Sequence, residues 1–234
     1  MCRVISYNIH SGVGRDKKQD YKRIGEFLVE QRADIVLLQE MDTRPAHRSI
    51  DKDIKDICAN NTYKLTASPA LFEESGWYGN AVLSRFDVIS HDTFKIGHLN
   101  RQPRNIQIVK LLTDQGPLTV LNTHFGLKRW ERRKQLTALF SYVKKQLHTN
   151  QTPLLLAGDF NEWQLGSGLF KPLNKLLNQQ AFGATFPSVF PLFSLDRAWL
   201  TSEITILQAK KINTQQTKNL SDHLPILIDF ELPN

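Results

Sequence analysis

The chain has 234 residues, which is enough for one large domain with a substantial core. Hydrophobic residues make up 41% and charged residues 23%, so the composition is that of a globular protein and excludes a disordered one. No apolar run is long enough to span a bilayer, and the first residues lack the pattern of a signal peptide. We therefore expect a single domain over residues 1–234, in a cytoplasmic monomer with no transmembrane segment and with peripheral membrane contact as an alternative.

Charge and cysteine content indicate the kinds of partner and chemistry. The net charge is +7, and this sign favours polyanions such as nucleic acid or an anionic lipid surface. The two cysteines, Cys2 and Cys58, do not have the spacing of a metal site. We expect them to be unpaired, buried thiols.

The first half of the chain predicts strands mixed with helices. Apolar runs predict strands over 4–7 and 35–38, and the helical spacing that follows Asp20 predicts a helix capped by this residue. A second helix is expected from Ile50 to about Ala59, and a loop over 71–79. Further strands are predicted over 81–83, 88–94, 106–112 and 118–122, with Gly116-Pro117 as the turn before the last one.

The second half continues the same alternation. A helix is predicted from about Trp130 to Leu147, and a short one around 169–177. An aromatic loop containing prolines is expected over 182–193. Strands are predicted over 153–157, 194–201, 204–210 and 226–230. With no internal repeat or linker, the pattern favours one α/β domain.

Polar side chains follow the apolar strands at the points where the strands end. Each of them alone is explained by chance, because acids and amides are common turn residues. Together they contain carboxylates, carboxamides and histidines but no reactive thiol or serine, which favours a hard cation and a phosphate group. These residues are Asn8, Glu40, Asn122, His124, Asp159, Asn161, Asp196, Asp222 and His223.

Seven short motifs in chain order carry a resemblance to a known family. They are Ser-Tyr-Asn8-Ile-His, Leu-Leu-Gln-Glu40, Gly79-Asn80-Ala-Val-Leu-Ser-Arg, Asn122-Thr-His124, Gly-Asp159-Phe-Asn161, Leu-Asp196-Arg and Ser-Asp222-His223-Leu-Pro. In these motifs the chain resembles the endonuclease/exonuclease/phosphatase superfamily from residue 3 to about 230. Its members include apurinic endonucleases, pancreatic-type deoxyribonucleases, neutral sphingomyelinases and inositol-phosphate 5-phosphatases. The resemblance implies an α/β (α+β) fold, a four-layer α/β sandwich in which two packed, mainly antiparallel sheets are flanked by helices.

The resemblance also implies roles for individual residues. Glu40 resembles the main ligand of Mg²⁺ (or Mn²⁺), and Asn8 and Asp222 complete or support that site. Asp159 would orient or deprotonate the attacking water, and Asn161 would hold phosphoryl oxygens. His223 would contact the scissile phosphate, with Asp196 fixing its tautomer.

Two further points follow from the resemblance. Whether Asp159 or His223 takes the proton stays open. His124 occupies the position at which deoxyribonuclease-like and sphingomyelinase-like members carry a histidine, whereas apurinic endonucleases carry a tyrosine there.

Other residues give weaker indications. Asn80, Asn122 and Arg129 are expected to contact substrate, although Asn80 beside Gly79 also suits a turn. Glu73 or Glu74 is a candidate partner for His124. His10 is expected in a loop, and His47, His91, His98 and His148 are expected at the surface.

Basic residues crowd the start of the predicted helix at 130. They are either a solvated face or an anion-binding rim next to His124, to which Arg101 and Arg104 would add. The members of this group are Lys128, Arg129, Arg132, Arg133 and Lys134.

The sequence thus predicts a Mg²⁺-dependent phosphodiesterase in which an activated water attacks a phosphoester in line. Its histidine at position 124 and its basic charge favour a nuclease. The alternatives are a phospholipid or sphingolipid head-group hydrolase or an inositol-phosphate hydrolase. An alternative of another class is a non-catalytic binding module on the same fold.

Overall fold

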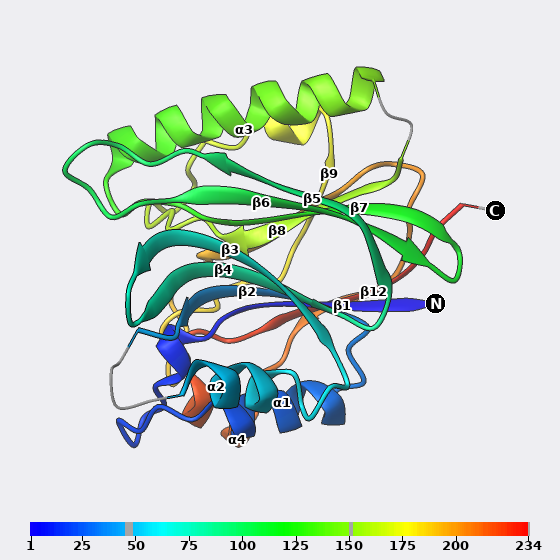
Figure 1. Cartoon of the computed structure of the whole chain (residues 1–234). Coiled ribbons are helices and arrows are strands. Elements are labelled where there is room, and N and C mark those ends of the chain that lie inside the picture. The colour runs from blue at the N-terminus through cyan, green and yellow to red at the C-terminus, as the bar shows by residue number, and fades with distance from the viewer. Residues whose placement is uncertain (45–48, 150–151, 234) are drawn as a thin grey trace.

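The structure, a computed structural model, describes residues 1–44, 49–149 and 152–233, and its elements form four layers (Figure 1). Helix α3 (Arg129–Thr149) covers the outer face of one sheet. Helices α1 (Tyr21–Glu30), α2 (Ile50–Ile57) and α4 (Gln215–Leu220) cover the outer face of the other. The four-layer α/β sandwich predicted from the sequence is confirmed.

The sheet next to α1 has the strand order β11-β12-β1-β2-β4-β3. Its strands are β1 (Cys2–Asn8), β2 (Ile35–Asp42), β3 (Lys64–Glu73), β4 (Gly76–Ser84), β11 (Thr205–Lys211) and β12 (Ile226–Glu231). Strands β1 and β2 are parallel, and all other neighbours in this sheet are antiparallel.

The sheet next to α3 has the order β5-β6-β7-β8-β10-β9. Its strands are β5 (Asp87–Lys95), β6 (Asn105–Thr113), β7 (Gly116–His124), β8 (Leu154–Asp159), β9 (Asn178–Gln180) and β10 (Asp196–Leu200). Here β7 and β8 form the parallel pair, and the other neighbours are antiparallel. Each sheet therefore has one parallel pair at its centre, and the two strands of such a pair end at the same edge of the sheet.

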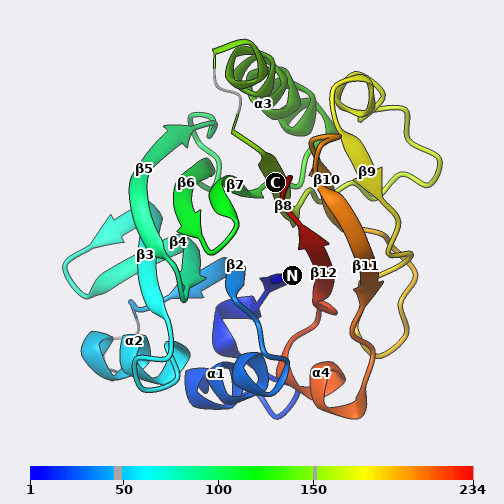
Figure 2. The same cartoon turned by 90° about the vertical axis from the view of Figure 1, so that its right-hand side faces the viewer.

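The central strands are buried on both faces, which explains their nearly continuous apolar sequences. Along β8, Leu155 and Ala157 face the layer between the sheets, whereas Leu154 and Leu156 pack under α3. The two termini lie together at one end of the sandwich (Figures 1 and 2). The carboxyl ends of β1 and β8 lie at the opposite end (Figure 1).

Several local predictions are confirmed. Asp20 caps α1, because its side chain accepts hydrogen bonds from the backbone N–H groups of Lys22 and Arg23. Cys2 and Cys58 are buried and unpaired. Among the described residues, no helix is long and apolar enough to cross a membrane.

Three local predictions are wrong. Residues 71–79 are not a loop, because β3 and β4 form a hairpin there that pairs Glu73 with Gly76. Gly116 and Pro117 begin β7 after a turn at 114–115, and Gly116 has the positive φ of +115° that glycine tolerates. The helix expected at 169–177 is only a 3₁₀ turn (Leu173–Lys175), since Pro172 has no N–H to continue a longer helix.

The layer between the sheets changes character along its length. It is apolar in the middle, but towards the carboxyl ends of β1 and β8 it contains a buried amide network centred on Asn122. The Asn122 Nδ2 donates to the carbonyl oxygens of Leu38 (2.9 Å) and Ala81 (3.1 Å), and its Oδ1 accepts from Gln39 Nε2 (2.8 Å). Asn122 has no exposed surface. Its amide therefore ties β7 to β2 and β4 of the other sheet.

We expect Asn122→Leu to destabilise the protein by about 2–4 kcal/mol, because it leaves two backbone carbonyls and one amide buried without these partners. Urea unfolding of the variant and the wild type measures the loss. The matched control is Asn178→Leu at an exposed position of β9. A loss below about 1 kcal/mol in Asn122→Leu would contradict a structural role for this amide.

Candidate functional site

The candidate residues meet because both parallel pairs end at the same end of the sandwich. Asn8 ends β1 and Asp159 ends β8, on opposite sheets. The Asn8 Nδ2 donates to Asp159 Oδ2 (2.9 Å) and to Glu40 Oε1 (3.1 Å). One amide therefore holds two carboxylates from different sheets around a common point.

A bulge in β2 turns Glu40 towards this point. The pairing of β2 with β4 shifts register between Leu38 and Met41, and Glu40 has the positive φ of +60°. Bulges often redirect a side chain. A glutamate in the left-handed backbone region is unfavourable in free energy unless the surrounding structure holds it there. The Glu40 side chain keeps 23% of its surface exposed, whereas that of Asp159 keeps 1%. Glu40 is therefore the carboxylate of this pair that solvent reaches.

The turn after β8 places Asn161 against His124. Gly158 lies so close to β7 that a Cβ would be 2.0 Å from the carbonyl oxygen of Thr123, so only glycine fits there. Beyond it, Asp159 Oδ1 accepts from the backbone N–H of Asn161 (2.8 Å), which adopts the positive φ of +49°. The Asn161 Nδ2 then lies 3.0 Å from His124 Nε2.

His124 is held as a neutral imidazole. Burial, and then the positive charges of Arg104 and His223, lower its pKa well below the usual range. The hydrogen-bond geometry agrees, because Asn161 Nδ2 (3.0 Å) and Arg104 Nη2 (3.5 Å) are donors that both face His124 Nε2. That nitrogen therefore accepts hydrogen bonds, although Asp159 Oδ2 lies only 3.5 Å from it.

His223 is held in the opposite state by a second pair of residues. Asp196 begins β10 directly opposite Asp159, and its Oδ2 lies 2.9 Å from His223 Nδ1. The other ring nitrogen, Nε2, lies 3.7 Å from Asp159 Oδ2. Burial by itself would lower the pKa of His223, but the carboxylates of Asp196 and Asp159 outweigh it and raise this pKa to about 10.

Asp159 is therefore a buried acid between two histidines. Burial raises its pKa to about 6, with a further contribution from Asp196 and against the opposing charge of His223. An acid whose pKa lies near neutral pH and which faces a charged imidazole is suited to proton transfer.

The oxygen donors fit a hard divalent cation, which would stabilise charge on phosphoryl oxygens when bound. Among the described residues, no group of three or more His, Cys, Asp and Glu side chains forms a metal cluster. Mg²⁺, however, is usually bound by only one or two carboxylates together with water and substrate oxygens. Glu40, the carboxylate of the pair that solvent reaches, can supply one such ligand.

Asp222 lies near this point but does not contact the two carboxylates. Its Oδ1 is 3.4 Å from Ser221 Oγ and 3.9 Å from His10 Nδ1. The Ser221 hydroxyl donates to the backbone oxygen of Asn8 (2.8 Å), which anchors the Ser-Asp-His segment beside β1.

The three residues expected to contact the substrate lie in different parts of the structure. Asn122 lies inside the amide network between the sheets. Asn80 is also buried, and its Nδ2 donates to Asn105 Oδ1 (2.9 Å), although it lines a small cavity together with His124. Arg129 is exposed and lines a separate cavity with Arg133 and Glu162.

Glu73, one of the two candidate acid partners of His124, binds Arg44 (3.1 Å). The carboxylates near His124 are those of Asp159 and Glu40. The sequence placed Glu73 in a loop free to reach the histidine. The structure instead places it at the end of a paired strand.

The basic residues that were expected to form one rim lie in different environments. Arg132 is buried and binds Glu162 (3.2 Å), while Arg101 and Lys128 line a pocket that also contains Arg104. His10, His91 and His148 are exposed, and His98 is half-buried against Trp130 (ring centroids 4.9 Å apart). His47 lies outside the described residues.

One contact of the site histidines was not predicted: the ring of Phe186 lies 4.9 Å from that of His223. It has no local sequence signal, because Phe186 belongs to the loop over 182–193. Arg104, which was expected to add to an anion-binding rim next to His124, does contact this histidine, with its Nη2 at 3.5 Å from His124 Nε2.

Comparisons with known proteins find chains of similar sequence and similar fold. The protein YbhP of Escherichia coli (strain K12), itself uncharacterised, is 26% identical over 252 residues, covering 98% of this chain and 96% of YbhP. The mannosyl-6-phosphatase Bt3783 of Bacteroides thetaiotaomicron has a similar fold, with a TM-score of 0.80 at 18% identity over 98% of this chain and 99% of that one. The human Nocturnin catalytic domain with bound sulfate anion also has a similar fold, with a TM-score of 0.77 at 20% identity over 98% of this chain and 93% of that one.

The family itself follows from the sequence match. Residues 5–223 match the model of the Endonuclease/Exonuclease/phosphatase family, which is nearly the whole chain. The sandwich fold and the seven motifs are consistent with this match. The chain therefore belongs to the endonuclease/exonuclease/phosphatase family, a superfamily of hydrolases that act on phosphoester bonds.

Proposed function

We propose that the protein is a Mg²⁺-dependent phosphodiesterase of the nuclease type, with Mn²⁺ as an alternative metal. The observation that carries this proposal is the convergence of Asp159, His223 and Glu40 at one end of the sandwich. Asp159 Oδ2 lies 3.7 Å from His223 Nε2 and shares the Asn8 amide with Glu40. Hydrolysis of a phosphoester needs a group to accept the proton of water and positive charge for the phosphoryl oxygens, and these residues supply both.

Asp159 is our choice for the base. His223 already carries a proton in the field of Asp196 and Asp159, so it is poised to donate rather than to accept one. Its charge would lie beside the phosphoryl oxygens, where negative charge develops in the transition state. Asp196 is the positioning residue that holds Nδ1 and thus directs Nε2 towards Asp159.

The remaining candidates would bind and orient the phosphate and the cation. Glu40, Asn8 and Asp222 would hold the cation. Asn161 would donate to a phosphoryl oxygen with the hydrogen that binds the carbonyl oxygen of Phe125 (3.0 Å) in this structure. Neutral His124 would accept the other hydrogen, which orients this amide. The alternative of a non-catalytic binding module finds no support, because every motif position carries a functional side chain.

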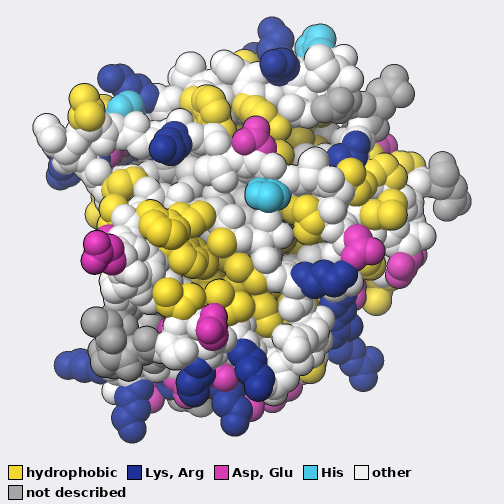
Figure 3. Space-filling model, viewed as in Figure 1, with side chains coloured by type: hydrophobic (Ala, Val, Ile, Leu, Met, Phe, Trp, Pro, Cys, Tyr) yellow, Lys and Arg dark blue, Asp and Glu magenta, His cyan; other side chains and the backbone are white. Residues whose placement is uncertain are grey.

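The distribution of surface charge bears on the choice of substrate. On the face in Figure 3, Lys and Arg side chains lie in separate groups, and an apolar area lies between them. A continuous basic stripe, the usual footprint of a nucleic acid, is not seen on this face. A nuclease is still favoured by the net charge and by His124, while lipid head groups and inositol phosphates are the alternatives that the assay below distinguishes.

We expect Asp159→Asn and Glu40→Gln each to lower the rate of phosphoester cleavage by about 10²–10⁴-fold, because they remove a charge but keep the shape. The assay measures metal-dependent cleavage of plasmid DNA, single-stranded RNA, an abasic duplex, phospholipid or sphingomyelin vesicles and a soluble inositol polyphosphate. Asp114→Asn, in the exposed turn before β7, is the matched control. Turnover like that of the wild type in folded Asp159→Asn would refute the assignment.

Metal binding can be tested apart from activity. We expect Mg²⁺ to raise the melting temperature of protein that has been treated with a chelator, because binding to the folded state stabilises it. The increase should be smaller in Glu40→Gln and unchanged in Asp114→Asn. An equal increase in all three proteins would place the cation elsewhere.

The charge on His223 makes a prediction about pH. In the metal-free protein, Asp196→Asn should lower the pKa of His223 from about 10, since the nearest carboxylate is removed. A raised pKa stabilises the folded state fully below the ordinary value of about 6.5, and this stabilisation disappears as the pH rises towards 10. Titration of the His223 ring by NMR, assigned with His223→Gln, measures the pKa directly. An unchanged pKa in Asp196→Asn would show that Asp196 does not control it.

A further inference from the structure

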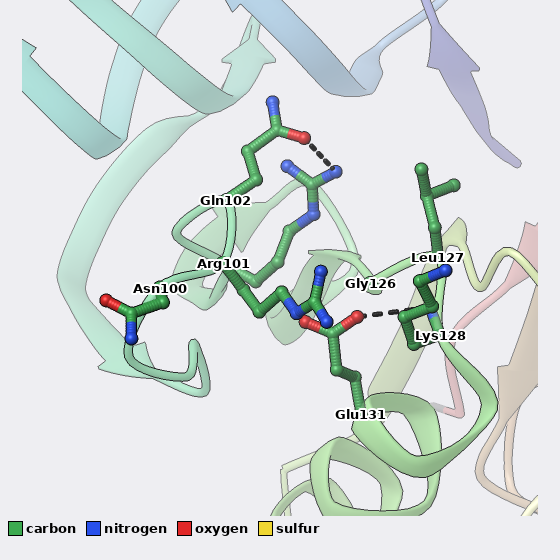
Figure 4. A pocket seen from close by; sticks show the side chains of 8 residues that line it. Asn100, Arg101, Gln102, Gly126, Leu127, Lys128 and Glu131 are labelled. Carbon is green, nitrogen blue, oxygen red and sulfur yellow. Dashed lines mark hydrogen bonds between the residues drawn. The ribbon is translucent and has the colours of Figure 1, made fainter.

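A pocket of about 500 Å³ lies between the segment 100–104 and the start of α3 (Figure 4). Arg101, Arg104 and Lys128 line it, together with Gln102 and Glu131. It adjoins the site described above, because Arg104 also contacts His124. The roles proposed above for the catalytic and metal-binding residues do not use this pocket.

Arg104 is the unusual member of the pocket lining. Only 6% of its surface is exposed, yet no carboxylate of the described part of the chain forms an ion pair with it. Its guanidinium contacts neutral groups, with Nη2 at 2.9 Å from Gln102 Oε1 and 3.5 Å from His124 Nε2, and Nε at 3.3 Å from the Phe125 oxygen. A buried cation without a counter-charge is unfavourable, so this position favours an anion.

Two exposed cations add to the positive charge of the pocket. Lys128 directly precedes α3, and the Arg101 guanidinium lies 5.9 Å from the ring centroid of Trp130, a contact that favours an ordered side chain. The opposing charge is Glu131, whose Oε2 accepts the backbone N–H of Lys128 (3.1 Å). Three cations therefore face one carboxylate. This balance suits a terminal phosphate, which carries a charge of about −1.5 to −2 at pH 7.

We propose that this pocket binds a second phosphoryl group of the substrate, next to the phosphoester that is cleaved. The inference rests on the proposed function and adds to it the class of substrate, a phosphoester that carries a further phosphate. Arg104 lies between the two positions, with His124 on one side and the pocket on the other. The second phosphate can belong to a nucleotide or to a sugar or polyol phosphate, and the chemistry that recognises it is the same.

The first experiment compares matched substrates that differ only in this phosphate. One pair is the p-nitrophenyl ester of thymidine 5′-phosphate with and without a 3′-phosphate. The other pair is a sugar bisphosphate and the corresponding monophosphate, and its cleavage is measured by the release of inorganic phosphate. We expect wild-type protein to prefer the additional phosphate in at least one pair. In Arg101→Ala/Lys128→Ala this preference, as a ratio of kcat/KM values, should fall by about 10–100-fold.

The control keeps the change in net charge the same. Lys144→Ala/Lys145→Ala removes two exposed lysines further along the same helix and should leave the preference unchanged. A preference for the nucleotide pair identifies the neighbouring phosphate of a nucleic acid, and a preference for the sugar pair identifies a small bisphosphate. The absence of preference in both pairs, or equal losses on both members of a pair in Arg101→Ala/Lys128→Ala, would overturn the proposal.

A binding measurement separates this inference from the proposed function. Calorimetric titration of chelator-treated protein with inorganic phosphate should show binding to the wild type and to Lys144→Ala/Lys145→Ala, and binding at least about tenfold weaker to Arg101→Ala/Lys128→Ala. If no phosphoester is cleaved but this pattern is found, the proposed function fails while the anion site stands. Equal binding by all three proteins, or none by the wild type, would overturn the anion site.

Discussion

The candidate site depends on polar contacts that cross from one sheet to the other at a single end of the sandwich. Asn8 binds Asp159, Asp196 binds His223, and Asn122 binds Gln39, each pair joining the two halves of the fold. The middle of the layer between the sheets is mainly apolar, and apolar packing has no direction. Hydrogen bonds between buried groups require a defined geometry, since an unmet partner is costly. The position of one sheet on the other therefore determines the distances between the functional side chains.

Burial acts on the site residues in different ways because their neighbours differ. His124 and His223 are both buried, but two donors face His124 Nε2, whereas His223 lies between two carboxylates. One imidazole is thus kept neutral and the other charged. Pairs of titratable groups whose pKa values are shifted in opposite directions by their surroundings are typical of catalytic sites. Asp159 lies 3.7 Å from the charged ring of His223, so its own charge depends on the protonation of that histidine.

The sequence was most informative where polar side chains directly follow a predicted strand. The polar residues after the predicted strands at 4–7, 35–38 and 153–157 do converge, because the carboxyl ends of parallel neighbours lie at one edge. The sequence was least informative about features that depend on which strands pair with each other. The hairpin of β3 and β4 was expected as a loop, and Glu73, one of two candidate partners for His124, lies in a paired strand and binds Arg44. The expectation of a single domain over residues 1–234 stays a prediction.

The sequence by itself determined the family, the layers of the fold and the types of side chain at the strand ends, because local apolar patterns and short motifs carry that information. Only the tertiary structure decided which of these side chains meet. It made Asn122 a link between the sheets, paired Arg132 with Glu162, and left Arg104 buried beside His124 without a carboxylate among the described residues. The physical reason is that burial and ion pairing depend on contacts between segments far apart in the chain. No local pattern records those contacts.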